Sequence, residues 1–349
     1  MSGRNLNTRV GFKTGSIFVA LGLTVGGVFA YAKTSGSMPG ETSQPVGDRG
    51  SGGAGQGVAE AVAPEGGSFP DTWASGVECA NEPPFQVHAY GEDFYIIRQS
   101  KCVNYEAPFL FLFVGETRAL LMDTGAVPDA DVYDTVMEIL EDRAGGLESR
   151  RVPLVVAHTH SHGDHVSADA RFEGAPGVET VVGRSVDDVI DFWGFTDWPN
   201  DTPTFDLGNR VFDVIAIPGH HGTSIALYDR RTGVLLTGDS VYPGHLFIPS
   251  EEAWHMVATS LDGLVAFAAA NPVSWVLGNH IEVSSRAREP YPYRTAAHPN
   301  ERALHFAPTK LQEIADAVRA MGDTPRCEVH DYFVIQPTYL CGSGWNGEG

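Results

Sequence analysis

The sequence predicts a mixed α/β fold in which helices cover β-sheets and loops at strand ends carry the functional residues. Two patterns predict it. Short apolar segments rich in β-branched residues recur along the chain, and a side chain suited to metal binding directly follows most of them. Amphipathic stretches with helical spacing separate these segments. With 349 residues, the chain is long enough to bury a sizeable core in one large domain or two small ones.

The predicted strands share one arrangement, in which an apolar run leads into a loop that begins with polar or glycine residues. They are residues 109–114 and 118–122 as one hairpin, 152–157, 211–217, 225–228 and 234–237 as a second hairpin, and 274–277. The loops after these strands begin with or soon reach Asp123, the segment from His160, then His220, Asp239 and His280. We therefore expect these side chains to carry the chemistry of the protein.

Three stretches have helical spacing. Residues 129–143 place apolar side chains on one face, and a second helix is expected to start after Ser250 and to run to Ala270. Glu251 and Glu252 suit the positive N-terminal end of that helix. Residues 309–321 form the third predicted helix, with Gly322 directly after it.

The most informative segment, residues 159–165, has the sequence THSHGDH. It gathers three histidines and one carboxylate within six positions: His160, His162, Asp164 and His165. Imidazole nitrogens and carboxylate oxygens are the ligands that a borderline-soft ion such as zinc prefers. The alternative is a surface cluster of mixed polar residues, but further ligand-type residues at the other strand ends favour a metal site.

Five segments of the sequence resemble the motifs of the metallo-β-lactamase-fold superfamily in order and context. They are LMDTG, THSHGDH, IPGHHGTS, LLTGD and LGNH. The resemblance covers about residues 85–285. It implies an αββα sandwich, in which two mixed β-sheets are flanked by helices and the metals lie at one sheet edge. Within the superfamily, the motifs are nearer to thioester hydrolases of the glyoxalase II type and to lactonases than to true β-lactamases.

The resemblance also implies a ligand set for two divalent ions, with zinc as the first choice and iron or manganese as alternatives. Five histidines and two carboxylates suffice for two ions with a position left open for water. The ligands implied are His160, His162 and His220 for the first ion, Asp164, His165 and His280 for the second, and Asp239 as a bridge between them. Asp123 resembles the strand-end aspartate that supports such a site.

These ligands predict a hydrolase that uses a bridging hydroxide to cleave a small ester, lactone or thioester. Asp164 is placed to receive or orient the proton of the nucleophile. Asp239 stands where β-lactam-cleaving members usually have Ser or Cys, which disfavours a β-lactam substrate. Tyr242 resembles a lactonase tyrosine that donates a hydrogen bond to an oxyanion, but a tyrosine that only packs after a strand is equally consistent. The alternative activity is that of an iron-dependent oxidoreductase of the persulfide dioxygenase type.

Charge and targeting signals limit the partners and the compartment. The chain carries 44 Asp plus Glu against 23 Lys plus Arg, which disfavours nucleic acid or an anionic membrane as a partner. The small-molecule substrate is expected from the predicted hydrolase site. Residues 1–33 combine a basic start with an apolar run and predict a signal peptide or an N-terminal membrane anchor. Residues 34–70 form a Gly/Ser/Pro-rich linker and residues 71–349 the hydrolase domain. Either N-terminal alternative places that domain outside the cytoplasm.

The four cysteines, Cys79, Cys102, Cys327 and Cys341, have no zinc-type spacing, and an exported chain favours disulfides. Three pairings are open. We favour Cys79–Cys102 and Cys327–Cys341, because each closes a short loop, with unpaired buried thiols as the alternative.

Other residues near the motifs have two alternative roles. His158 and His221 are expected to support the site or face solvent rather than bind metal. The aromatic residues of segment 192–198 either line a pocket mouth or pack in the core.

Overall fold

The computed structural model describes residues 64–128, 131–147 and 150–345. The described residues all belong to one compact unit, Glu60–Gly349. The predicted signal or anchor segment and most of the predicted linker lie outside the described residues. In the compact unit, the backbone N–H of Glu65 donates to the carbonyl oxygen of Arg231, and Phe69 stacks on His305. The packed structure therefore begins before Asp71, the predicted start of the domain.

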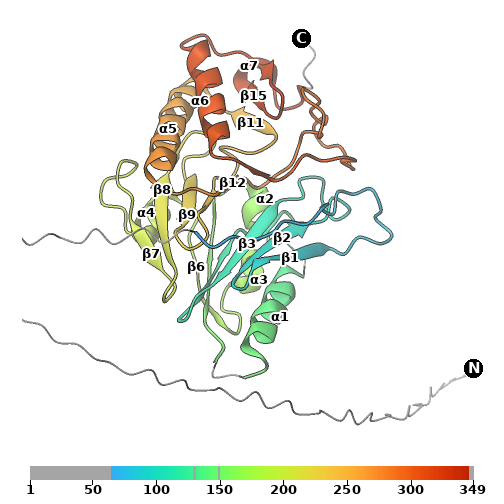
Figure 1. The fold of residues 1–349 in the computed structure, drawn as a ribbon, viewed down its shortest axis with the longest axis vertical. Helices are drawn as coiled ribbons and strands as arrows, with labels where there is room; N and C mark the ends of the chain where they lie inside the picture. The colour runs from blue at the N-terminus through green and yellow to red at the C-terminus, as the bar shows by residue number, and fades with distance from the viewer. Residues whose placement is uncertain (1–63, 129–130, 148–149, 346–349) are drawn as a thin grey trace, which may run out of the picture. The chain divides into compact units, whose positions relative to one another are not determined.

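Two six-stranded mixed sheets form the centre of the described chain (Figure 1). The first, in the order β1-β2-β3-β4-β5-β6, consists of β1 (Phe85–Gly91), β2 (Phe94–Gln99), β3 (Phe109–Val114), β4 (Ala119–Met122), β5 (Leu154–Ala157) and β6 (Val178–Val181). The second, in the order β13-β12-β10-β9-β8-β7, consists of β7 (Thr204–Asp206), β8 (Val211–Ala216), β9 (Ile225–Asp229), β10 (Val234–Leu236), β12 (Trp275–Leu277) and β13 (His305–Phe306). Both predicted hairpins are confirmed, because β3 pairs with β4 and β9 pairs with β10, antiparallel in each case.

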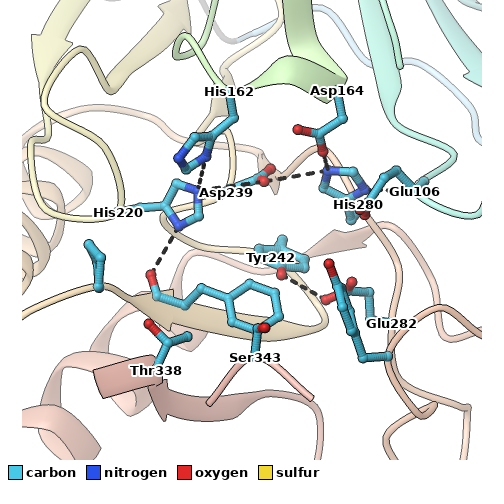
Figure 2. A pocket seen from close by; sticks show the side chains of 13 residues that line it. Glu106, His162, Asp164, His220, Asp239, Tyr242, His280, Glu282, Thr338 and Ser343 are labelled. Atoms are coloured by element: carbon cyan, nitrogen blue, oxygen red, sulfur yellow. Dashed lines mark hydrogen bonds and ion pairs between the residues drawn. The ribbon is translucent and has the colours of Figure 1, made fainter. Parts of the chain in front are cut away.

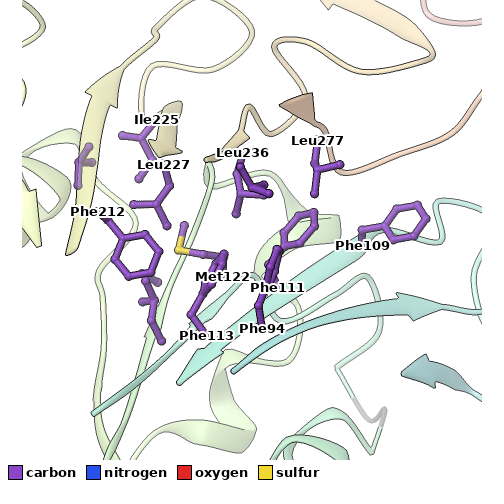
Figure 3. Close-up of a cluster of buried hydrophobic side chains, with 14 of the residues drawn as sticks. Phe94, Phe109, Phe111, Phe113, Met122, Phe212, Ile225, Leu227, Leu236 and Leu277 are labelled. Atoms are coloured by element: carbon purple, nitrogen blue, oxygen red, sulfur yellow. The ribbon is translucent and has the colours of Figure 1, made fainter. Parts of the chain in front are cut away.

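The alternation of side chains along the strands explains how the layers are filled. In β3, Phe111 and Phe113 join side chains of β8, β9 and β10 in a core between the two sheets (Figure 3). Leu110 and Leu112 point to the opposite face and pack against α1. Since both faces of β3 are buried, the strand is apolar at every position rather than alternating with polar residues.

Helices cover the outer face of each sheet. The helices are α1 (Val132–Ala144), α2 (Gly163–Val166), α3 (Asp169–Phe172), α4 (Val186–Trp193), α5 (Glu251–Ala270), α6 (Thr309–Met321) and α7 (Thr338–Cys341). Side chains of α1 and α3 pack on the first sheet, whereas side chains of α5 and α6 pack on the second. The predicted αββα sandwich and its three predicted helices are thus confirmed, and Ser250 caps α5 by accepting a hydrogen bond from the N–H of Ala253.

A third, three-stranded sheet lies beside the sandwich and was not predicted. In the order β11-β15-β14, it consists of β11 (His245–Ile248), β15 (Val334–Pro337) and β14 (Glu328–Val329). The Cys327–Cys341 disulfide ties the segment before β14 to α7, and the second disulfide joins Cys79 to Cys102. Both pairings agree with the predicted ones, and no described cysteine is free.

By length and composition, α5 is the one described helix that could cross a membrane. Its buried side chains Trp254, Val257 and Leu261 belong to the core that it forms with α6 and the second sheet. This packing accounts for its apolar composition.

Candidate metal centre and pocket

The loops that follow five strands of the two large sheets bring the predicted site residues together. Asp123 follows β4, His160 follows β5, His220 follows β8, Asp239 follows β10 and His280 follows β12. All seven predicted ligands fall into two groups. Within each group, the ligand atoms lie within 4.8 Å of one another. Residues separated by up to 120 positions in the sequence thus meet at one place in the fold.

The first group contains His160, His162 and His220. Nδ1 of His162 lies 3.0 Å from Nε2 of His160 and 2.9 Å from Nε2 of His220. Neutral imidazole rings whose lone pairs point toward the same spot do not attract one another. A cation at that spot would bind all three nitrogens. The arrangement therefore fits a divalent metal ion.

The second group contains Asp164, His165, Asp239 and His280. Asp239 Oδ2 lies 3.3 Å from Nε2 of His165 and 3.4 Å from Nε2 of His280. The same oxygen lies 3.8 Å from Nε2 of His160, in the first group. Oδ1 of Asp239 is buried without a hydrogen-bond partner among the described residues. A buried carboxylate within reach of both histidine groups fits the bridging position implied by the sequence (Figure 2).

Acceptors behind the histidines fix which ring nitrogen faces the site. Nδ1 of His220 donates to the carbonyl oxygen of Phe247 at 3.0 Å, and Nδ1 of His280 donates to that of Glu106 at 2.9 Å. A carbonyl oxygen can only accept, so each Nδ1 carries a proton. In the neutral ring, the lone pair is therefore on Nε2, which faces the site.

Asp123 connects three of the loops from behind. Its Oδ1 accepts the backbone N–H of Thr159 at 2.8 Å, and its Oδ2 accepts Nδ1 of His165 at 3.0 Å and Nδ2 of Asn279 at 2.6 Å. The side chain is fully buried, and the backbone has a φ of 71°, a conformation that aspartate tolerates better than most residues. Of the predicted ligands, His165 is the one that forms a hydrogen bond with Asp123 among the described residues, a contact that fits the supporting role implied by the resemblance.

The two groups differ in their electrostatics. Burial alone would raise the pKa of the Asp239 carboxyl, but His280 and His165 hold it well below its ordinary value. Burial would lower the pKa of His165, yet Asp164 and Asp239 raise it well above its ordinary value. The pKa of His160 is well below the ordinary value, because burial and the neighbouring His165 disfavour its charged form. Metal binding requires neutral imidazoles and ionised carboxylates, so loading the second group would release protons.

A pocket of about 420 Å³ opens over both groups. Five predicted ligands (His162, Asp164, His220, Asp239 and His280) and Tyr242 form its floor, and Glu106 and Glu282 also line it. The opposite wall comes from the third sheet, α7 and the segment after His280. It consists of Phe247, Pro249, Tyr293, Thr338 and Ser343. Figure 2 shows Thr338 and Ser343 across the pocket from His162 and Asp164.

Tyr242 is buried at the pocket floor with its hydroxyl already engaged. The hydroxyl lies 2.7 Å from Oε2 of Glu282 and also contacts the carbonyl oxygen of His245. Burial and the Glu282 carboxylate raise the pKa of Tyr242 well above its ordinary value. One hydroxyl has one proton to donate, so the oxyanion role stays a prediction that requires the hydroxyl to leave these acceptors.

Several residues of the site were not predicted from the sequence. Asn279 lies within the LGNH motif and could have been found there, because it is the amide that donates to Asp123. Glu106, Glu282 and Tyr293 belong to no motif. Their place in the pocket depends on how distant segments pack.

The structure also shows where His158, His221 and the aromatic residues of segment 192–198 lie. Nε2 of His158 lies 3.2 Å from Oδ2 of Asp169, and the ring of His221 stacks edge-on at 4.7 Å from that of His162. Both support the site from outside the ligand groups. Trp193 and Phe195 are buried in the core between the sheets and do not line the pocket, so core packing is the correct reading for them.

Gly278 sets the separation between two of the ligand loops. A side chain there would overlap the Cβ of Tyr242 and crowd the carbonyl oxygen of Gly238. The backbones therefore touch directly, and the N–H of Asn279 donates to the carbonyl oxygen of Gly238 at 3.2 Å. Asp239 and His280, the next residues along these two loops, are held at a distance set by the backbone.

Comparisons with known proteins show what this chain is similar to. Residues 107–266 match the family model of the metallo-beta-lactamase superfamily. The human acyl-coenzyme A thioesterase MBLAC2 is 25% identical over 209 residues, which are 51% of this chain and 75% of that protein. The hydroxyacylglutathione hydrolase of Methylococcus capsulatus is 31% identical over 152 residues, or 42% of this chain and 55% of that protein. A solved metallo-beta-lactamase from Pontibacter korlensis has 15% identity and a TM-score of 0.44, covering 67% of this chain and 99% of its own.

Both sequence relatives are named as hydrolytic enzymes. The names of these two relatives do not favour the alternative activity, that of an iron-dependent oxidoreductase.

Proposed function

Because this chain belongs to the metallo-beta-lactamase superfamily, we propose that it is a metal-dependent hydrolase that cleaves a thioester or ester at a two-metal site. The observation that carries the proposal is the place of Asp239. A single oxygen of this carboxylate lies 3.3 to 3.8 Å from four imidazole nitrogens, two from each ligand group. A carboxylate shared by two nitrogen sets is what a pair of neighbouring divalent ions requires.

The residues have distinct roles in this proposal. The first ion would be held by His160, His162 and His220, and the second by Asp164, His165 and His280, with Asp239 shared. Zinc suits these nitrogen and oxygen ligands, and iron and manganese remain alternatives. When bound, the ions supply Lewis acidity and lower the pKa of a water toward neutrality.

The side chains of the pocket complete the proposed chemistry. Asp164 Oδ2 lies 3.4 Å from Nε2 of His165 and also 3.4 Å from Nε2 of His280, at the pocket floor, where it can hold or orient a proton of the attacking water. Asp123 keeps the ring of His165 in one orientation. The apolar wall opposite the ligands accommodates the acyl or leaving group of a small-molecule substrate.

We also propose that the catalytic domain works outside the cytoplasm. Both disulfides of the described chain suit an oxidising compartment. The N-terminal segment would then serve as a cleaved signal or as a membrane tether.

The test is turnover by the full chain loaded with zinc, on a thioester, a lactone, an aryl ester, a β-lactam and a phosphodiester. Asp239→Asn is expected to lower turnover by about a hundredfold or more and to reduce the bound metal, measured by elemental analysis. Asp187→Asn is the matched control, because Asp187 is an exposed carboxylate on α4. Full turnover and full metal content in Asp239→Asn would refute the proposal. Elemental analysis of the chain as purified also identifies the metal.

A further inference from the structure

The pocket is lined by acidic side chains and by no lysine or arginine among the described residues, and this affects which substrates it can bind. Apart from the predicted metal ligands, the ionisable acids at the pocket surface are the carboxyl groups of Glu106 and Glu282. Among the described residues that line the pocket, none is a lysine or an arginine. This inference rests on the proposed function, because it concerns the substrate of the same site.

The backbone of Glu106 and the carboxylate of Glu282 are held in place by their surroundings. The backbone of Glu106 is fixed on one side by His280, which donates to its carbonyl oxygen, and on the other by Asn104, whose Oδ1 accepts its N–H at 2.9 Å. Oε2 of Glu282 accepts the Tyr242 hydroxyl at 2.7 Å and the N–H of His245 at 3.0 Å. Neither carboxylate forms an ion pair with a lysine or arginine among the described residues.

The nearest cations are directed elsewhere. Nζ of Lys101 is buried and donates to the carbonyl oxygen of Tyr105 at 2.5 Å. The guanidinium of Arg294 lies over the rings of Tyr105 and Tyr293, 5.4 and 5.2 Å from their centroids, and is exposed outside the pocket lining. An anionic group close to the scissile bond would therefore meet carboxylates rather than these cations.

The bound ions do not reverse this balance. Two divalent ions would bring four positive charges, which the carboxyl groups of Asp164, Asp239, Glu106 and Glu282 and the hydroxide of the predicted mechanism offset. The pocket lining adds no positive charge with which to attract an anion. On the opposite wall, the rings of Phe247 and Tyr293 pack edge-on at 6.3 Å. Aromatic π faces attract cations, as the guanidinium of Arg294 over the Tyr293 ring illustrates.

We propose that Glu106 and Glu282 make this site select thioesters or esters whose groups next to the scissile bond are cationic or uncharged, and discriminate against anionic ones. Glu106 and Glu282 act as specificity-determining residues through their charge.

The test uses three butyryl thioesters that differ in the charge of the thiol. They are the thioesters of thiocholine, which is cationic, of 3,3-dimethylbutanethiol, its uncharged isostere, and of 2-mercaptoethanesulfonate, which is anionic and a weak metal ligand. For the zinc-loaded full chain, kcat/KM is expected to be at least about tenfold higher for the cationic than for the anionic thioester, with the uncharged one between them or equal to the cationic one.

Single and double variants assign the effect. Glu106→Gln and Glu282→Gln should each reduce the cation-to-anion ratio of kcat/KM severalfold, and the double variant should bring it near one. Glu92→Gln, an exposed carboxylate outside this pocket, removes the same charge and should leave the ratio unchanged. Glutamine keeps an oxygen that can accept from Tyr242 and from the N–H of His245, and circular dichroism and metal content verify that each variant is folded and loaded.

A binding measurement separates this inference from the proposed function. The uncleavable butyl thioethers of the same three thiols are titrated calorimetrically into the metal-free and the zinc-loaded chain. Tighter binding of the cationic thioether, lost in Glu106→Gln, supports the inference even if no thioester is cleaved, in which case the proposed function alone fails. Equal or better handling of the anion, or a cation preference that survives the double variant, overturns the inference.

Discussion

The two walls of the pocket differ in origin. The ligand wall is made by loops at the ends of strands in the two large sheets, and most of its residues lie within the segment 107–266 that matches the superfamily. The opposite wall is made by β11, α7 and the segment after His280. Of that wall, Tyr293, Thr338 and Ser343 lie outside the matched segment.

The difference teaches which part of the site the large sheets hold and which part depends on small elements. Loops at strand ends are held by rigid sheets, so ligand geometry follows from the fold itself. The opposite wall is held by one short sheet, a four-residue helix and the Cys327–Cys341 disulfide. We expect metal binding to depend on the first wall, and substrate choice to depend on the second wall together with Glu106 and Glu282.

The largest effect is expected at the support of the ligand wall. Asp123→Ala leaves the buried donors of Thr159, His165 and Asn279 without their acceptor. The free energy of unfolding should fall by about 3–5 kcal/mol, and metal affinity by about 10–100-fold. Urea denaturation and competitive zinc titration measure the two effects. Asp123→Asn keeps one acceptor and should lose less; an unchanged metal affinity in both variants would contradict the assigned role.

The next effect concerns the opposite wall. Replacing both Cys327 and Cys341 by serine releases α7, whose Thr338 lines the pocket, and should cost about 2–4 kcal/mol of stability. Since no predicted ligand lies in this segment, KM should rise while the bound metal stays the same. Steady-state kinetics and elemental analysis test this together. Metal loss with unchanged KM would mean that the two walls are not separable in this way.

A pH effect of about 2 kcal/mol should come from Lys101, on the loop that leads to Glu106. Burial and the neighbouring Arg98 lower the pKa of Lys101 to about 8. Between that pH and the ordinary lysine pKa of 10.5, the unfolded chain binds more protons than the folded chain, so stability should rise with pH. From pH 8 to pH 10, the free energy of unfolding should gain about 2 kcal/mol more in the wild type than in Lys101→Met. Equal pH slopes in guanidinium titrations of the two proteins would argue against this.

The smallest effect is expected for Tyr242→Phe, at the junction of the two walls. Loss of the hydrogen bond to Glu282 should cost about 1–2 kcal/mol of stability and change kcat by less than tenfold. An oxyanion donor would behave differently, with kcat lowered by about 10²–10³ and stability nearly unchanged. Kinetics and denaturation of the same variant therefore decide between the two roles of this tyrosine.

The ligand wall could be predicted from the sequence because its signals are local. His160, His162 and Asp164 lie in one short segment, and the remaining ligands directly follow apolar strands that are easy to identify. The two disulfide pairings agree with the predicted ones, which rested on short spacing and on the predicted export of the chain. The alternation of strands and helices predicted sheets covered by helices, and the resemblance to the superfamily implied the αββα sandwich.

The opposite wall could not be predicted, because its contacts are distant and its elements are short. β14 has two residues and α7 has four, too few for a hydrophobic period to be recognised. Glu282 meets the Tyr242 hydroxyl across 40 positions and Tyr105 meets Tyr293 across 188, and neither pair belongs to a motif. The packing of Phe69, which precedes the predicted domain start at Asp71, could not be predicted for a related reason, because its ring lies against those of Tyr90, Trp275 and His305, which are distant in the sequence.

Backbone contact at Gly278 has a consequence for how such a protein can diversify. The separation of Asp239 from His280 is set where Gly278 meets Gly238, without any side chain of the opposite wall. Random substitution at Phe247, Tyr293 or Ser343 can therefore generate new specificities in a mutant library while the two ligands keep their spacing. Gly278 itself tolerates no such variation, and a library randomised there should consist almost entirely of inactive clones.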